Sequence, residues 1–192
     1  MPAGSTMNAP RQAGAGLVEV AIALLLLSIG ALGLANMQIG AKRLGFEALQ
    51  RTEAAALAGD LFERMRANRQ GLQRYRSAGI GEGSGRRLAV PGRNCDTQSC
   101  EPAERGDWDL WQWEAALNGN ATLDAAHTAV GGLVKPIACV AVDNGLVTLE
   151  IAWEGHRQLS AGTILSDCGS GAYGPDGSRR QLLQISSYIG AQ

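Results

Sequence analysis

The feature that most constrains this chain is an uncharged apolar segment near its N-terminus. No residue between Glu19 and Lys42 carries a charge, and the segment reads VAIALLLLSIGALGLANMQIGA. A helix over these residues would span the ~30 Å hydrocarbon core of a bilayer at about 1.5 Å per residue. The sequence from Lys42 onward is mixed and polar enough to fold in water. We therefore expect one membrane-length helix followed by one soluble domain.

This segment does not have the pattern of a removable secretory signal. Such a signal has an apolar run of about 7–15 residues followed by a cleavage site of small residues. Here the run is longer, no clear site follows it, and Glu19 stands at its front edge. An acidic side chain at membrane depth costs about 2.5–3.5 kcal/mol. Glu19 therefore either has a cationic partner or lies at the headgroup level, and the residues leave both readings open.

Charge and cysteine content favour opposite orientations of the soluble domain. Only Arg11 precedes the apolar segment, whereas Lys42, Arg43 and Arg51 follow it, so the positive-inside rule would place the domain in the cytoplasm. The domain has an even number of cysteines, which favours two disulfides in an oxidising compartment. They are Cys95, Cys100, Cys139 and Cys168.

Other roles for these cysteines are weaker. The spacing of Cys95 and Cys100 suits zinc, but no second close pair and no nearby His completes a site, so we expect no metal. Of the three pairings that four cysteines allow, we choose Cys95–Cys100 and Cys139–Cys168. This choice closes one local loop and joins a predicted strand to a late loop.

The residues around the apolar segment resemble the N-terminus of type IV prepilins. In that family a Gly precedes the cleavage point and a Glu is the fifth residue of the mature chain, and Gly14 and Glu19 have this spacing. The stretches 63–68 (ERMRAN) and 179–189 (RRQLLQISSYI) also resemble those of minor pilins of the type IV pilus. The resemblance is strong over about residues 14–70, moderate over 170–190 and weak between them.

This resemblance implies an α+β fold in which a long N-terminal helix packs on an antiparallel β-sheet head. Residues 1–14 would be a leader, 15–41 a transmembrane and assembly helix, 42–70 its amphipathic continuation, and 71–192 a periplasmic head with two disulfides. Prepilin peptidase would cut after Gly14 and methylate Ala15. Glu19 would meet the positive amino terminus of a neighbouring subunit in an apolar bundle.

The function that the resemblance implies is structural. The chain would be a minor pilin, anchored in the bacterial inner membrane and assembled into the extracellular pilus, that primes or modifies assembly and tunes adhesion or motility. Its partners would be other minor and major pilins and the assembly machinery of the inner membrane. Two alternatives remain: a minor pseudopilin of a type II secretion system, and a signal-anchored periplasmic binding domain that joins no filament.

The helix is predicted to continue past the membrane, from about Leu17 to Arg69. The apolar residues Leu57, Leu61 and Met65 recur every four positions on one face, which Phe62 widens. On the other side two acid-first pairs stand at i,i+4. They are Glu47 with Arg51 and Asp60 with Arg64.

The remaining sequence predicts a short helix and a sheet. Residues 77–85 are rich in Gly and predict an exposed loop. Asp107 is the expected N-cap of a helix that ends near residues 118–119, with Trp108 and Trp111 as core residues. Residues 137–142 and 146–153 flank Asp-Asn-Gly and predict a hairpin, whose Val147, Leu149, Ile151 and Trp153 would face Leu57, Leu61 and Met65. A glycine-rich loop over 169–180 would lead into a last strand over 181–189.

Enzymatic and nucleic-acid-binding functions find little support. Only His127 and His156 are candidates for a general base, no G-x-S-x-G motif is present, and the Gly run lacks a following Gly-Lys-Ser/Thr. Asp167 and Asp176 lie in turn-like sequence. The formal net charge is -1, without the basic bias of a nucleic-acid binder. We therefore expect no catalytic residue and no cofactor.

Overall fold

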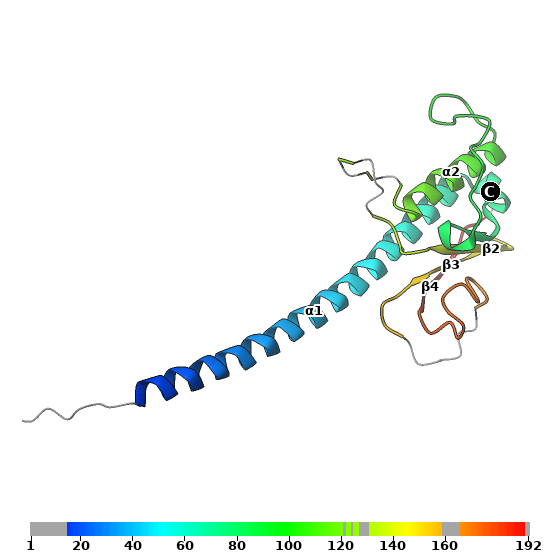
Figure 1. Cartoon of the computed structure of the whole chain (residues 1–192). Coiled ribbons are helices and arrows are strands. Elements are labelled where there is room, and N and C mark those ends of the chain that lie inside the picture. The colour runs from blue at the N-terminus through cyan, green and yellow to red at the C-terminus, as the bar shows by residue number, and fades with distance from the viewer. Residues whose placement is uncertain (1–14, 121, 124, 127–130, 159–165, 191–192) are drawn as a thin grey trace, which may run out of the picture. The chain divides into compact units, whose positions relative to one another are not determined.

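The computed structural model describes residues 15–120, 122–123, 125–126, 131–158 and 166–190 (Figure 1). The chain divides into two units, Met1–Leu44 and Gly45–Gln192, and one helix, α1, contributes to both. Each unit is described by itself.

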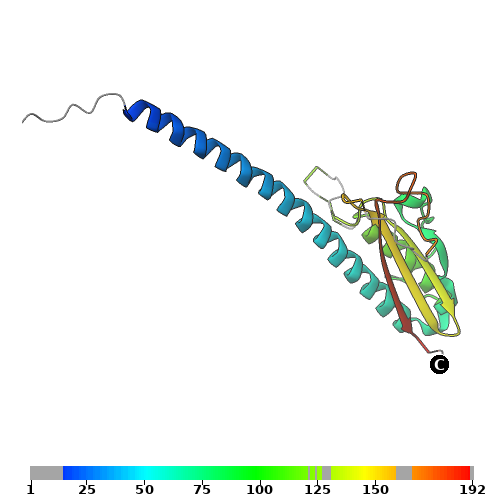
Figure 2. The same cartoon turned by 90° about the horizontal axis from the view of Figure 1, so that it is seen from below.

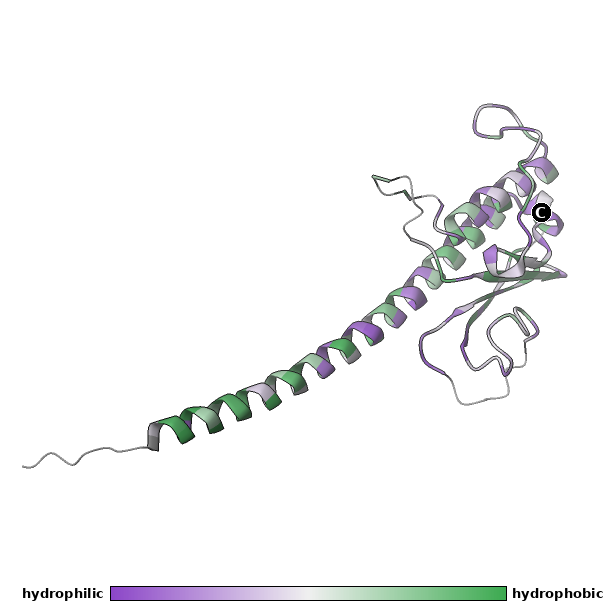
Figure 3. Cartoon of the chain, viewed as in Figure 1, coloured by the Kyte–Doolittle hydropathy of each residue, from purple (hydrophilic) through white to green (hydrophobic). Residues whose placement is uncertain are grey.

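Helix α1 comprises Ala15–Ala67, 53 residues without a proline. Its bounds differ by two residues at each end from the predicted ones. In the first unit its residues are mostly apolar, as Figure 3 shows, and all side chains described there are exposed. By length and composition this helix is apolar enough to cross a membrane. From Gln50 onward α1 contributes buried residues at intervals of three and four, so its second half is one wall of the head core.

The segment after α1 corrects one prediction. A 3₁₀ helix, Arg69–Tyr75, leads into strand β1, Ser77–Ile80, and a second 3₁₀ turn, Glu82–Ser84. The predicted exposed loop over 77–85 is therefore wrong, since Ile80 is 1% exposed and β1 pairs with the sheet. The glycines there permit close approach of two backbones, because a Cβ on Gly81 would lie 2.5 Å from the Pro136 carbonyl oxygen.

Helix α2, Pro102–Leu117, begins earlier than predicted. Its N-cap is Glu101, whose backbone N–H donates to the Glu104 carboxylate at 2.9 Å in a capping box, with Pro102 in the first turn. The prediction that Asp107 is the N-cap is wrong. Asp107 lies in the second turn, where it forms an ion pair with Arg74 at 2.6 Å.

The predicted aromatic pair on α2 is only half in the interior. The Trp108 side chain is buried, Trp111 is partly exposed, and their rings lie 5.1 Å apart. The central aromatic residue is Trp113, which is fully buried and donates its indole N–H to the Leu57 carbonyl at 2.8 Å. This bond joins α2 directly to the second half of α1.

The sheet has four antiparallel strands in the order β1-β2-β3-β4. Strands β2, Ile137–Asp143, and β3, Leu146–Glu154, form the predicted hairpin, with Asn144 at φ 48° and Gly145 at φ 85° in its turn. Strand β4, Arg180–Tyr188, is the predicted last strand and pairs with β3. The expected α+β fold, a long N-terminal helix with an antiparallel sheet, is confirmed.

Helix α2 and the second half of α1 lie on one face of the sheet, as Figure 2 shows, and the core of the head lies between these helices and the sheet. Val147, Leu149, Ile151 and Trp153 of β3 are all buried and belong to one apolar cluster with the α1 residues. Those α1 residues include Leu57, Leu61, Met65 and Phe62. The predicted packing of the hairpin on α1 is thus confirmed.

Candidate functional site

The most unusual surface of the described chain is the apolar first half of α1. Its large aliphatic side chains up to Leu44 are between 51% and 84% exposed. They are Leu17, Val18, Val20, Ile22, Leu24, Leu25, Leu26, Leu27, Ile29, Leu32, Leu34, Met37, Ile39 and Leu44. Contiguous apolar surface on this scale marks an interface with protein or with lipid. We call residues 17–44 of α1 the apolar surface.

The predicted assembly residues lie at the start of α1. Gly14, before the expected cleavage point, is outside the described residues, and Ala15 is the first residue of the helix. Glu19 lies four residues later and is exposed among apolar neighbours. Because residues four apart in a helix share a face, the Glu19 carboxylate lies on the same side as the first residue of α1, about one turn further along.

The structure pairs the four cysteines as the sequence analysis chose. Cys95 is bonded to Cys100, and Cys139 of β2 is bonded to Cys168. The second bond holds the segment before β4 against the outer face of the sheet, where Tyr173 is buried in a small cluster with Ile137. No thiol is free among these cysteines, so none serves as a nucleophile or a zinc ligand.

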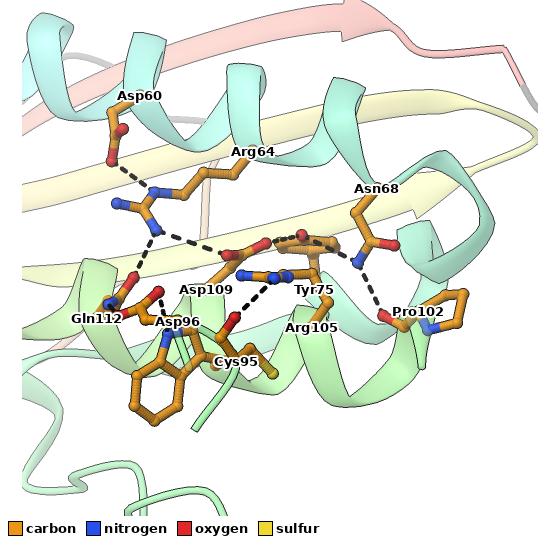
Figure 4. A network of polar contacts seen from close by, with 11 residues as sticks. Asp60, Arg64, Asn68, Tyr75, Cys95, Asp96, Pro102, Arg105, Asp109 and Gln112 are labelled. Carbon is orange, nitrogen blue, oxygen red and sulfur yellow. Dashed lines mark hydrogen bonds and ion pairs between the residues drawn. The ribbon is translucent and has the colours of Figure 1, made fainter. Parts of the chain in front are cut away.

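A partly buried polar network that the sequence analysis missed joins α1 to α2 (Figure 4). The Arg64 guanidinium is 2.9 Å from Asp60, 3.6 Å from Asp109, and donates to Gln112 at 3.0 Å. The Tyr75 hydroxyl donates to the other oxygen of Asp109. Only the Asp60–Arg64 pair has a local sequence signal, because the other contacts join residues more than ten positions apart.

The same network continues to the 3₁₀ helix and the start of α2. The Asn68 amide donates to the Tyr75 hydroxyl at 3.2 Å and to the Pro102 carbonyl at 2.8 Å. Burial raises the pKa of the Asp109 carboxyl, against the opposing effects of the Tyr75 hydrogen bond and the Arg64 charge. Burial, with the hydrogen bond to Asp109, also raises the pKa of Tyr75. Arg64, Asn68 and Asp109 also line a surface pocket together with Arg105. Their polar groups are bonded to one another, and these bonds join α1, the 3₁₀ helix and α2.

The short disulfide loop is attached to α2 beside this network. The Asp96 carboxylate accepts from the Trp108 indole at 3.2 Å and from the Gln112 amide at 2.8 Å. Arg105 donates to the Cys95 carbonyl at 2.9 Å (Figure 4). The loop is therefore held on α2 by side chains as well as by the Cys95–Cys100 bond.

The weaker catalytic candidates are not brought together. The ring of His156 packs against the Phe46 ring, with 5.5 Å between the ring centroids. Next to it, the Glu47 carboxylate accepts from the Arg157 backbone N–H and not from its predicted partner Arg51. Asp176 accepts from the Ser178 backbone N–H, which lowers its pKa, as in an ordinary turn. His127 lies outside the described residues. Within the described part of the chain no cluster of His, Cys, Asp or Glu could hold a metal.

One comparison with known proteins finds a match. The family model described as Tt1218-like, type IV pilin Tt1218, matches residues 36–111, from the apolar surface through the second half of α1 into α2. A search of curated proteins and a search of solved structures each found nothing that matches. The family match supports a type IV pilin, a class of structural subunit that interacts with other pilins.

Proposed function

We propose that this chain is a minor pilin of a type IV pilus, anchored in the bacterial inner membrane by the first half of α1 and then built into the filament. The observation that carries the proposal is the apolar surface: its side chains are exposed, while the second half of the same helix is buried in a complete head core. The N-terminal residues resemble those of the minor pilin called type IV pilus modification protein PilV, and the proposed role in priming assembly or tuning adhesion rests on this resemblance.

An anchor that is also an assembly surface explains why the large aliphatic side chains of the apolar surface are exposed. Leu and Ile side chains of this kind are stable in the hydrocarbon core before assembly. When a subunit leaves the membrane, the same side chains need another apolar environment, which a bundle of like helices supplies. Membrane anchoring with a periplasmic head is also the arrangement that suits the two disulfides.

Glycines on α1 support close packing against neighbouring helices. Gly16 and Gly30 are 14 residues apart, about four turns, and so share a face, as do Gly45 and Gly59 in the head half. A Cβ added at any of these four positions would meet nothing within 4 Å. Glycine in a helix interior destabilises the helix by roughly 0.5–1 kcal/mol relative to alanine. Within the described residues no close contact requires glycine at these four positions. Small residues of this kind let helix backbones approach in an apolar environment.

Glu19 gives the apolar surface a specific contact. Ala15 would become the amino terminus after removal of residues 1–14, and its positive charge would pair with Glu19 of a neighbouring subunit. In an apolar bundle an unpaired carboxylate is costly, so the pair would select the correct stagger between subunits. Recognition of the leader by prepilin peptidase precedes this step.

N-terminal sequencing of the protein isolated from membranes tests the premise. We expect a start at Ala15, with or without methylation. An intact leader in membranes that contain active prepilin peptidase would rule out the pilin proposal and favour the signal-anchored binding domain.

A matched pair of glutamate variants tests the role of Glu19. Glu19→Gln keeps the size and removes the charge, and we expect normal membrane insertion with at least tenfold less protein in sheared filaments. Glu63→Gln is the control, because Glu63 is on the exposed face of the head half, where it forms an ion pair with Arg66 at 2.5 Å. Equal recovery of both variants in filaments would contradict the assigned role.

Membrane crosslinking separates the two filament systems. We expect crosslinks of the full chain to other minor and major pilins and to the pilus assembly machinery. Crosslinks to components of a type II secretion system in their place would favour the pseudopilin alternative.

A further inference from the structure

The two edges of the sheet are protected to very different degrees. Strand β1 has four residues, its register with β2 shifts between Ser77 and Ile80, and the residue that follows it, Gly81, forms an antiparallel bridge with Arg86. Strand β4 pairs with β3 in unbroken register over nine residues. Bulges and short length prevent an edge from pairing with other chains, so β1 is a closed edge and β4 is not.

Two hydrogen bonds at the ends of β4 show which of its backbone groups face outward. The Ile189 N–H donates to the Gly145 carbonyl at 2.7 Å, and the Gly155 N–H donates to the Arg179 carbonyl at 2.8 Å. Both pairs fit the register of β3 with β4, so the odd-numbered residues of β4 bond to β3. The Arg180 N–H correspondingly points elsewhere, to Gly177.

The even-numbered residues therefore present N–H and C=O groups on the outer side of β4. They are Leu182, Gln184, Ser186 and Tyr188. Among the described residues none provides a backbone partner for these groups. They form a row about 20 Å long, at about 3.3 Å per residue, which is enough for a full strand.

The side chains of this edge also lack the usual protection. Residues 181–188 contain no charge, no proline and no glycine. Gln184 and Ser186 are exposed, and Tyr188, which is 71% exposed, stands opposite the half-exposed Leu146 of β3. Exposed edges without Lys, Pro or bulges are ready to accept another strand.

We propose that the β4 edge accepts an extended, uncharged segment of a different pilin chain as a fifth, antiparallel strand of the sheet. Main-chain bonds to residues 182, 184 and 186 supply the attachment, and an apolar residue of the partner covers Tyr188 and Leu146. This inference rests on the proposed function, because it takes the partner to be another subunit of the same filament.

The geometry of the head argues against a second copy of this chain. Strand β4 runs in the same direction as the second half of α1, as contacts at both ends of the strand show. At the end of β4, Arg66 donates to Ser187 at 3.1 Å. At its start, Glu47 accepts from Arg157, which follows the end of β3 that pairs with Arg180. Antiparallel pairing of two β4 edges would point the two α1 segments in opposite directions, whereas two subunits anchored in one membrane need them alike. Parallel pairing is less stable per residue, and the β1 edge of a second copy is closed.

Photo-crosslinking in the full chain, in its own membranes, tests the inference. A photoreactive phenylalanine analogue replaces Gln184 in one variant and Ser186 in another, with Ala78 of the closed β1 edge as the control position. We expect both β4 positions to link to the same other pilin, at two of its residues that are two positions apart. Because the pairing is antiparallel, position 184 should link to the later of the two residues and position 186 to the earlier one. Position 78 should give no such pair of links. Links to a second copy of this chain, to lipid, or without this spacing would overturn it.

A backbone variant distinguishes strand addition from side-chain contact. Ser186→Pro removes an outward N–H, which an edge strand tolerates, so the head stays folded while the crosslink from position 184 falls at least tenfold. Ser186→Ala is the matched control, because it loses only the hydroxyl that lies 3.0 Å from Thr148, and it keeps the crosslink. An unchanged crosslink in Ser186→Pro would overturn the inference. If the mature chain starts at Ala15 and is recovered in filaments, but positions 184 and 186 do not link to residues two apart in another pilin, this inference fails and the proposed function stands.

Discussion

The two halves of α1 have the same secondary structure and opposite surroundings. Between residues 17 and 44 the leucines and isoleucines are exposed, whereas Leu57, Leu61 and Met65 are at most 7% exposed. Both halves are helical because neither contains proline and both are rich in residues that favour helix. Helix formation and burial are thus separate properties of this chain, and only the second half is buried by the head itself.

This difference indicates that two kinds of partner are needed. The second half is covered by α2 and the sheet, which belong to the same chain. The aliphatic side chains of the first half are exposed, and we expect lipid or other subunits to cover them. Substitutions should therefore divide sharply by position, and the following predictions test this division from the largest expected effect to the smallest.

The largest effect is expected at Trp113. Trp113→Ala removes a fully buried ring and its bond to the Leu57 carbonyl, so the free energy of unfolding of the head should fall by about 3–5 kcal/mol. Trp111→Ala, on the partly exposed neighbour, should cost much less. Chemical denaturation of the full chain in detergent, followed by tryptophan fluorescence and circular dichroism, measures both; equal losses would show that the α2 core is misassigned.

The same substitution in each half of α1 tests the comparison directly. Leu61→Ala should destabilise the head by about 2–5 kcal/mol, because Leu61 is fully buried. Leu27→Ala, at a position 69% exposed, should change head stability by less than about 0.5 kcal/mol. If Leu27→Ala destabilised the head as much as Leu61→Ala, the apolar surface would have to pack on the head. Filament recovery should be reduced by the change at Leu27 without a loss of folded head.

Removal of the longer disulfide should weaken the head alone. Replacing Cys139 and Cys168 together by Ser opens a loop of sequence separation 29 and should lower the free energy of unfolding by about 2–4 kcal/mol. Membrane insertion should not change, because the anchor contains no cysteine. Membrane extraction assays and denaturation curves of the double variant check the two parts; a loss of insertion would contradict the separation of the halves.

The smallest effect is expected from the buried carboxyl of the polar network. Because burial raises the pKa of Asp109, the folded head binds this proton more tightly than the unfolded chain does. Its contribution to stability is therefore present in full below the ordinary pKa of an aspartate and is lost as pH rises through the raised value. Asp109→Asn removes this dependence while keeping an acceptor for Tyr75.

The measurement is the free energy of unfolding of Asp109→Asn and of the unchanged chain between acidic and neutral pH. The free energy of unfolding of the variant minus that of the unchanged chain should become more positive as pH increases. Asp60→Asn is the control, because Asp60 is an exposed partner of the same Arg64. A difference that moves in the opposite direction would mean that the charged form of Asp109 is the stabilised one in the folded head.

Patterns that are local in sequence predicted most of the fold. The uncharged run of residues 20–41 predicted the first half of α1, the four-residue recurrence from Leu57 predicted the buried stripe, and Asp-Asn-Gly predicted the hairpin. The glycines of residues 77–85 were misleading, because they indicated a loop although part of this segment is strand β1. These glycines allow the backbone to approach residues 135–137 closely.

The candidate sites divide in the same way. The spacing of Gly14, Ala15 and Glu19 is a local pattern and was visible in the sequence, and it stays a prediction for the assembled filament. The contacts of Arg64 with Asp109 and of Trp113 with Leu57 join residues far apart in the chain. The open outer side of β4 follows from its register with β3, which is also set between distant residues. No periodicity in one segment carries that information.

The sequence by itself determined that an apolar helix precedes a disulfide-containing head, because length, charge and period are properties of consecutive residues. Only the tertiary structure decided which half of α1 is covered and which strand edge remains open. Burial depends on what the rest of the chain brings to a surface, and a hydrogen-bonding edge exists only once the register of every strand has been set.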